Sequence, residues 1–422
     1  MSEQGSTRAR RIHQPAVLLC LALVASVCAC SSEPLTVPTH ERPVPGCEQV
    51  DVHPCNALDH DCQVSRLELA ACLRETEPGN LPKVSYMTEQ EYADYINATY
   101  AGYVPPRPNH FENAMIWLGL TQPGSFDFVP KQPADLVDFF GTYRWRQKEL
   151  LIIDHGKPAD DVASNVELVS ALIRALRDRD IDIGPWTTQV GVFDVDSNWG
   201  SDGMYFGESQ FFANRYRAAL AASHVDEFEQ INQRIREDVA WIRAQPSPYV
   251  GTNERFARNF GARAAYLAWR RDGIDGVNAL YDSKRLTYQL MENATEEGPP
   301  RTLKYHTLPR ASEEWEYSPT TTAIGAWGLF LSLSQRLDEN AAWSLALKWS
   351  GEQLFVHKGV DANASETALI WQLEMEDEAS ASALEDVLRT YPLSPQVQRI
   401  GTFVTLAISS NETPLDWAFV SE

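Results

Sequence analysis

A polar stripe follows one side of an otherwise apolar predicted helix over residues 165–182, NVELVSALIRALRDRDID. Its apolar residues recur three and four apart, which is the spacing of an amphipathic helix with a broad buried face. The remaining face carries Glu167, Ser170, Arg174, Arg177 and Asp178. Side chains at this spacing lie along one line of a helix and can touch a common partner. The stripe is therefore the first candidate for residues that carry chemistry.

Four clustered cysteines form the second group of reactive residues: Cys47, Cys55, Cys62 and Cys72, with no cysteine after them. In an exported protein such a cluster predicts two disulfides, with three connectivities open, which staple a segment too small for its own core. Bonded pairs should have Cα separations of about 4.4 to 6.8 Å. Zinc is the alternative ligand, but no paired CxxC spacing supports it.

The same segment contains LDHDCQVSRLELAACL, which resembles the second half of an EF-hand calcium loop and its exit helix. The calcium-ligand places hold Asp59, Asp61, Ser65 and Glu68. The first acidic place, however, holds Ala57, and Cys62 replaces the glycine of the sharp turn. We therefore expect a disulfide-locked remnant, with weak calcium binding as the alternative.

The N-terminus predicts export. Three arginines precede the run PAVLLCLALVASVCAC, which is shorter than the ~20 apolar residues of a membrane-spanning helix and suits a signal-peptide core. The residues around Cys30 resemble a bacterial lipobox, in which the cysteine is acylated after cleavage. Cys28 fits less well, because Val27 would stand where a small residue is needed. An ordinary secreted protein cut nearby is the alternative.

The lipobox implies three N-terminal segments. Residues 1–29 are the signal peptide, Cys30 carries the lipid, and residues 30–46 are a Pro/Ser/Thr-rich tether that holds the protein off the membrane. Ser31 resembles the sorting pattern that favours the outer membrane. The expected location is therefore the cell envelope, with the lipid as the contact with the membrane.

The charge of the chain limits its partners. The formal net charge is −22, and it becomes −24 without residues 1–29, which hold three Arg and one Glu. Nucleic acid and anionic membrane surfaces are negatively charged and therefore attract positively charged protein surfaces. Neither is therefore expected as a partner of the folded domain.

Residues 83–422 show no low-complexity break and predict one domain. Thr88 and Glu91 in MTEQEYADYINATY form a capping box at a helix start. KELLIIDHG predicts a buried strand, and Gly273 ends the second of two long amphipathic helices, DEFEQINQRIREDVAWIRAQ and NERFARNFGARAAYLAWRRDG. Further strands are expected at EQLFVHKG, ALIWQLEM and VQRIGTFVTLAI, around the helix ASASALEDVLRTY. The expected fold class is α+β, predominantly helical with a small sheet, after a disulfide-rich module of residues 47–75.

The order of these elements resembles the HExxH zinc-peptidase-like lipoproteins of bacteria and haloarchaea, a minigluzincin-type family. The resemblance covers about residues 85–420. It depends on collinear segments: GTYRWRQKELLIID, the helix ending in LRDRDID, YFGESQFF, SPYVGTNERF and LALKWSGEQLFVHKG, followed by the strand of Trp371. It implies a gluzincin-like metallopeptidase-type domain.

In that family two histidines four apart bind zinc, and the glutamate between them acts as general base on the metal-bound water. On this sequence the histidine positions fall on Ser170 and Arg174, and the base position falls on Ala171. Serine is a poor zinc ligand, a guanidinium repels the cation, and alanine has no base. Only the third ligand is retained, as Glu208. The resemblance thus implies a degenerate site with no metal and no other cofactor.

No other residues are expected to rebuild a catalytic site. The histidines of residues 83–422 are His110, His155, His224, His306 and His357, and no two stand at metal-ligand spacing on a helix. The alternating charges of RDRDID at residues 177–182 predict a solvated surface.

These observations predict a catalytically inactive peptidase-like lipoprotein. Its role would be binding or scaffolding at the cell envelope, with an envelope protein or peptide in the former substrate cleft. An active peptidase with relocated metal ligands and a structural lipoprotein without a ligand are the alternatives.

One contact should distinguish a metal site that an ion pair has replaced from a position at which Glu208 is simply exposed and Arg174 points to solvent. A buried lone carboxylate is costly, so something must neutralise Glu208. Arg174 has the charge and a fork of donors that suits a carboxylate. We expect an Arg174–Glu208 ion pair, with Ser170 donating a further hydrogen bond.

Cys30→Ser should release the protein from membranes or block its maturation, because acyl chains on this cysteine would supply the anchor. Cell fractionation with immunoblotting measures the distribution. Unchanged membrane retention of the variant would contradict the lipobox assignment.

Overall fold

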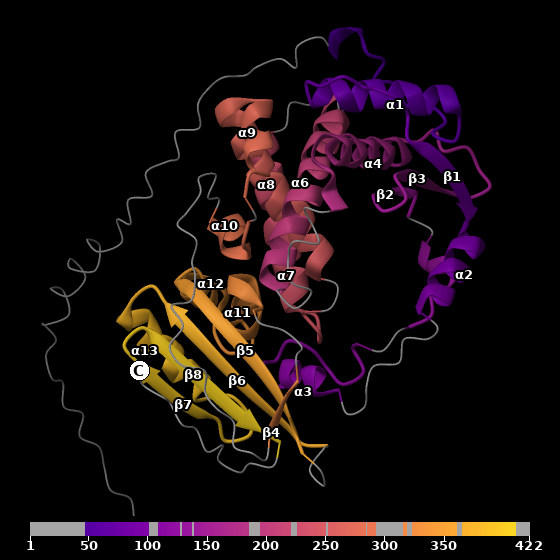
Figure 1. Ribbon diagram of the computed structural model, residues 1–422. Helices are drawn as coiled ribbons and strands as arrows, with labels where there is room; N and C mark the ends of the chain where they lie inside the picture. Colours follow the sequence, from indigo (N-terminus) through magenta and orange to yellow (C-terminus); the bar gives the residue numbers. More distant parts are fainter. Residues whose placement is uncertain are drawn as a thin grey trace, which may run out of the picture. The chain divides into compact units, whose positions relative to one another are not determined.

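Figure 1 shows the computed structural model of the chain, which contains helices and two small sheets. The structure describes residues 47–100, 109–126, 129–136, 139–184, 195–220, 226–249, 252–283, 285–292, 315–318, 323–360 and 365–410. The predicted signal peptide, Cys30 and the whole tether lie outside these residues, as do His224 and His306. In the described part of the chain, no helix combines the length and apolar character needed to cross a membrane.

The four cysteines form the two predicted disulfides. Cys47 is bonded to Cys72 and Cys55 to Cys62, each pair with Cα atoms 5.7 Å apart. Cys47 begins a short 3-10 helix, η1 (Cys47–Gln49), and Cys62 and Cys72 lie within α1 (His60–Leu73). Helix α1 packs against α4 (Val162–Ile181), so this segment shares the core of the domain that follows it.

The first sheet has the strand order β1-β3-β2. Strand β3 pairs in parallel with β1 and antiparallel with β2. The predicted buried strand KELLIIDHG corresponds to β3. The bounds are Lys83–Thr88 for β1, Gly141–Arg144 for β2 and Glu149–Asp154 for β3.

The predicted capping box is confirmed at the start of α2 (Glu89–Tyr100). The Thr88 amide donates to the Glu91 carboxylate at 2.8 Å, and the Glu91 amide donates to Thr88 Oγ1 at 3.2 Å. Two short helices follow α2 before the hairpin of β2 and β3: α3 (His110–Trp117) and η2 (Pro133–Leu136).

The longest helices, α6 and α8, lie side by side (Figure 1). Glycines permit the contact, because a Cβ atom on Gly261 would lie 1.7 Å from the carbonyl oxygen of Gly203. Gly273 follows α8 with φ +68°, as predicted for a helix end. In the described residues between α4 and β5, the helix bounds are α6 (Val195–Leu220), α7 (Glu227–Arg243), α8 (Thr252–Asp272), α9 (Ile274–Ala279), α10 (Thr287–Glu292), α11 (Gly325–Leu333) and α12 (Glu339–Ala346).

The second sheet is antiparallel, with the strand order β4-β5-β6-β8-β7. The predicted run VQRIGTFVTLAI is divided into two paired strands, because Gly401 makes the turn between them with φ +59°. The bounds are β4 (Trp315–Ser318), β5 (Trp349–Gly359), β6 (Thr367–Met375), β7 (Gln396–Ile400) and β8 (Phe403–Ser409), with α13 (Glu378–Leu388) after β6.

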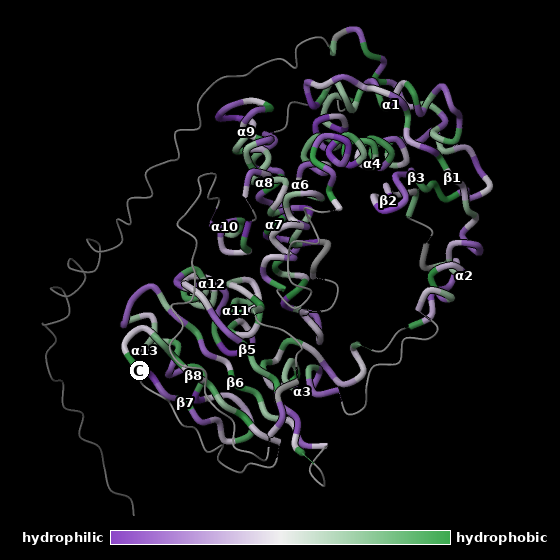
Figure 2. Tube along the Cα trace, in the orientation of Figure 1, coloured by the Kyte–Doolittle hydropathy of each residue, from purple (hydrophilic) through white to green (hydrophobic). Residues whose placement is uncertain are grey.

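Large apolar side chains fill the core, among them the fully buried Trp327 and Trp371. Hydrophobic residues recur between hydrophilic ones along α4 (Figure 2), as its sequence pattern predicts. The predicted α+β class is confirmed, with helices predominating over the two small sheets.

Candidate functional site

Glu208 on α6 lies at the centre of a buried group of charges. Its side chain is nearly inaccessible to solvent, with 1% of the residue exposed. Arg177 on α4 grips both carboxylate oxygens, since Nε donates to Oε2 and Nη2 to Oε1, each at 2.8 Å. Arg74 Nε donates to Oε1 at 2.9 Å, and the Tyr281 hydroxyl donates to Oε2 at 2.6 Å. We call these four residues the Glu208 cluster.

Outer contacts complete the cluster. Arg177 Nη2 also donates to Asn278 Oδ1 at 2.9 Å, and its guanidinium lies 4.1 Å from the centre of the Tyr281 ring. Arg74 Nη1 donates to Asp180 Oδ2 at 3.0 Å. Two guanidiniums are thus balanced by two carboxylates, and the oxygens of Glu208 accept four hydrogen bonds from the protein itself.

The charges hold each other in their ionised forms. Burial alone would raise the pKa of Glu208, but the charges of Arg177 and Arg74 lower it to about 2. For Arg177 the loss of solvent is likewise outweighed by Glu208, which raises the pKa of the guanidinium. Burial and the adjacent Glu208 raise the pKa of Tyr281 well above its ordinary value. The cluster therefore stays ionised at Glu208 and neutral at Tyr281 across the range in which proteins normally fold.

Segments far apart in the sequence position these residues. Arg74 is the C-cap residue of α1, two residues after the disulfide-bonded Cys72. Arg177 comes from the polar stripe of α4, and Tyr281 from the turn that follows α9. The disulfide module is thus joined to the cluster by a buried ion pair as well as by packing.

The prediction named the wrong arginine of the stripe. In the described part of the chain, the ion pairs of Glu208 are with Arg177 and Arg74. Arg174 instead donates to Thr142 Oγ1 at 3.2 Å, and its guanidinium lies 5.3 Å from the ring centre of Phe206. The contact with α6 is one helical turn nearer the end of α4 than the resemblance placed it.

The other degenerate positions do not meet Glu208 through any hydrogen bond in the described residues. Ala171 is 1% exposed and belongs to the apolar core. Ser170 is half-buried on the stripe, and its carbonyl oxygen lies 3.4 Å from Arg174 Nε, which donates to it. The expected hydrogen bond from Ser170 to Glu208 is therefore not formed.

The EF-hand-like residues do not wrap around a common point. Helix α1 begins directly after Asp59, so the side chains of Asp61, Ser65 and Glu68 project from a continuous helix instead of a loop. Asp59 accepts a hydrogen bond from the side chain of Asn56 at 3.1 Å. Over the described ranges, no group of three or more His, Cys, Asp or Glu side chains is placed to hold a metal ion.

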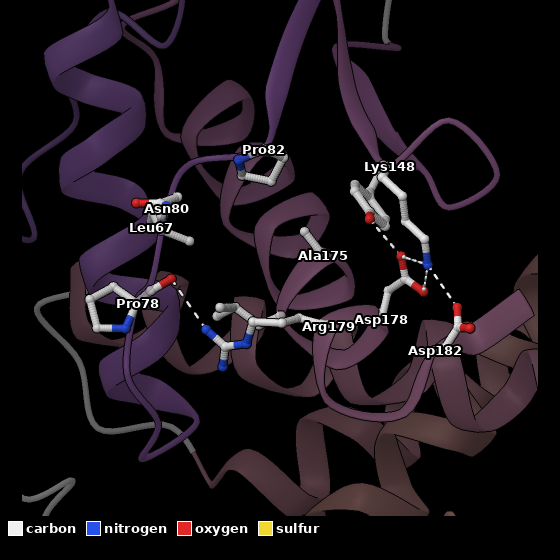
Figure 3. A pocket seen from close by; sticks show the side chains of 11 residues that line it. Leu67, Pro78, Asn80, Pro82, Lys148, Ala175, Asp178, Arg179 and Asp182 are labelled. Carbon is white, nitrogen blue, oxygen red and sulfur yellow. Dashed lines mark hydrogen bonds and ion pairs between the residues drawn. The ribbon is translucent and has the colours of Figure 1, made fainter.

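A pocket of about 460 Å³ lies along a neighbouring face of α4 (Figure 3). Apolar side chains, including Leu67, Pro82 and Leu176, form part of its lining. Lys148, the last residue of the turn before β3, reaches into the polar part of the pocket and donates to Asp178 at 2.8 Å and to Asp182 at 2.8 Å. We call it the α4 pocket.

The predicted solvated surface of RDRDID is found at Arg179, Asp180 and Asp182, which are exposed, but the prediction is wrong for Arg177 and Asp178. Both Arg177 and Asp178 are only 2% exposed. Asp178 also accepts hydrogen bonds from the Tyr143 hydroxyl at 2.6 Å and from the Ile183 amide at 2.9 Å. Burial and this contact raise the pKa of Tyr143, which keeps its hydroxyl a donor. The end of α4 therefore contributes to two polar sites, the buried Glu208 cluster through Arg177 and the open α4 pocket through Asp178.

No family model matches this chain, and neither a curated protein nor a solved structure is significantly similar to it.

Glu208→Gln should lower the free energy of unfolding by about 3–5 kcal/mol, because it leaves Arg74 and Arg177 buried without their counter-charge. Chemical unfolding at pH 7 measures the loss. Glu229→Gln is the matched control, since Glu229 is 62% exposed in its pair with Arg236 and should change the value by less than about 1 kcal/mol.

The same variant has a predictable pH dependence. A carboxylate whose pKa falls to about 2 on folding stabilises the native state above its unfolded pKa and loses that contribution as the pH falls toward 2. The difference between wild type and Glu208→Gln should therefore shrink below about pH 4. A small, pH-independent difference would contradict the ionised cluster.

Proposed function

We propose that this protein is an exported lipoprotein, anchored to the cell envelope through Cys30, whose peptidase-like domain binds a ligand or partner and does not hydrolyse it. The observation that supports this function best is that protein side chains already take up the hydrogen-bonding capacity of the Glu208 carboxylate. Both oxygens of the one retained zinc-ligand position already accept protein hydrogen bonds.

The charges around Glu208 oppose zinc. A catalytic zinc needs three protein ligands with free lone pairs and an open position for water. Here two guanidiniums, which have no lone pair to offer and carry fixed positive charge, lie within 2.9 Å of the carboxylate. A dication would have to displace both of them from a buried site. The cluster thus supports a domain in which an internal ion pair holds together the helices that a metal would otherwise join.

The α4 pocket favours binding over a purely structural role. Its volume of about 460 Å³ lies within the ~300–1,000 Å³ range of small-molecule sites, and it combines apolar walls with a few oriented polar groups. A lipoprotein that served only as a spacer would not need this combination.

Metal analysis of the purified full-length protein after exposure to zinc tests the proposal. We expect no stoichiometric zinc and no metal-dependent peptide hydrolysis. Stoichiometric zinc with chelator-sensitive hydrolysis would support the alternative of an active peptidase with relocated ligands.

A pair of rebuilt variants tests which helix positions face the former site. Ile173→His, Arg174→Glu and Arg177→His, combined with Arg74→Met, place the second histidine of the HExxH spacing at position 177, which contacts Glu208, and should create zinc binding. The matched control carries Ser170→His, Ala171→Glu and Arg174→His with the same Arg74→Met. It should bind less zinc, because position 174 contacts Thr142 and Phe206. Equal zinc binding by the two folded variants would reject this register.

A further inference from the structure

We propose that the α4 pocket binds an aliphatic ammonium group, such as the end of a lysine side chain in a peptide, and that Lys148 holds the place of that group within the protein's own structure. The inference deepens the proposed binding role by naming a ligand class. It uses none of the residues of the Glu208 cluster.

The acceptors are already arranged around an ammonium. Lys148 Nζ lies 2.8 Å from an oxygen of Asp178 and 2.8 Å from an oxygen of Asp182 (Figure 3). Asp178 is fixed by Tyr143 and by the Ile183 amide, so its position does not depend on Lys148 alone. Both carboxylates belong to the C-terminal turn of α4, where the helix dipole adds partial negative charge. The electrostatics of this end of the pocket therefore favour a cation.

The opposite part of the lining suits a hydrocarbon stem. Leu67, Pro82 and Leu176 present apolar surface in the same pocket. Lysine-like groups cover such surface with their methylenes while the ammonium stays with polar partners. A ligand that has both a stem and an ammonium would use both parts of the pocket, whereas an inorganic cation would use only one.

Anionic ligands are disfavoured by the same residues. The other cation in the lining, Arg179, is engaged: it donates to the carbonyl oxygens of Glu77 at 2.7 Å and Pro78 at 3.3 Å, and to Thr76 Oγ1 at 3.1 Å. Asp182 is 64% exposed and meets an entering ligand first. The chain's net charge of −22 also draws cations toward the protein at low ionic strength.

Lys148 can leave the pocket. Its side chain is 52% exposed, and its backbone has φ +52°, a left-handed conformation at the end of the turn between β2 and β3. Rotation of this side chain into water would leave Asp178 with two of its hydrogen bonds and free an oxygen of Asp182. A ligand ammonium would then restore the contacts that Lys148 gives up.

Calorimetric titration of the full-length protein at low salt tests the proposal, with Nα-acetyl-L-lysine methylamide as the probe. We expect saturable binding, about tenfold tighter than that of the norleucine analogue, which has the stem without the charge. Lys148→Met should tighten binding about tenfold, because it removes the internal competitor, and Asp182→Asn should weaken it about fivefold.

Matched controls are available on the second sheet. Lys348 and Glu376 form an exposed pair with side chains 45% and 52% accessible, close to the values of Lys148 and Asp182. Lys348→Met and Glu376→Gln should leave probe binding unchanged. The proposal is overturned if the lysine probe binds no better than the norleucine analogue, or if Asp182→Asn binds it as well as wild type. Asp182 is exposed, so its variant decides the matter even if Lys148→Met does not fold. Zinc content is measured separately, so failure here leaves the metal-free peptidase-like role standing.

Discussion

The ion pairs of Glu208 with Arg177 and Arg74 are the contact on which the arrangement of the helices depends. A carboxylate that is 1% exposed has lost nearly all its hydration, and the loss is several kcal/mol unless other charges replace the water. Two guanidiniums and the Tyr281 hydroxyl supply that replacement. Because the donors come from α1, from α4 and from the turn after α9, the cluster fixes these elements relative to α6.

The disulfides extend this constraint to the start of the folded part. Cys72 is bonded to Cys47 and stands two residues before Arg74. The segment is too short to bury much apolar surface by itself, so the bonds and the buried ion pair hold it in place together. In the proposed lipoprotein, the tether would join the folded domain at Cys47, close in sequence to one end of this connection.

Local sequence signals predicted the parts of the fold that depend on neighbouring residues. The capping box of Thr88 and Glu91, the strand β3 and the helix end at Gly273 all follow from side chains within a few positions of one another. The clustered cysteines predicted disulfides, although the connectivity needed the structure. The run at residues 397–408 was predicted as one strand, and the turn at Gly401 was missed because apolar residues continue on both sides of it.

The site was predicted less well, because it depends on how helices cross. The stripe on α4 offers Arg174 and Arg177 three residues apart, and both are consistent with a partner on the same side of the helix. Only the placement of α6 decides that Arg177 meets Glu208 while Arg174 meets Thr142. Arg74 could not be predicted, since nothing near it in sequence shows that α1 ends beside α6. Asp178 was misjudged for a similar reason: its partners Tyr143 and Lys148 belong to a hairpin some 30 residues away.

In the proposed peptidase-like domain, the ion pairs of Glu208 with Arg177 and Arg74 would stand where the metal is held. Carboxyl carbon NMR of Glu208 tests this arrangement most directly, with the resonance assigned by comparison with Glu208→Gln and followed against pH with and without zinc. We expect a carboxylate that stays ionised down to the pH of unfolding and a resonance that zinc does not move. A Glu208 that titrates near pH 4.5, or that shifts on stoichiometric addition of zinc, would contradict it.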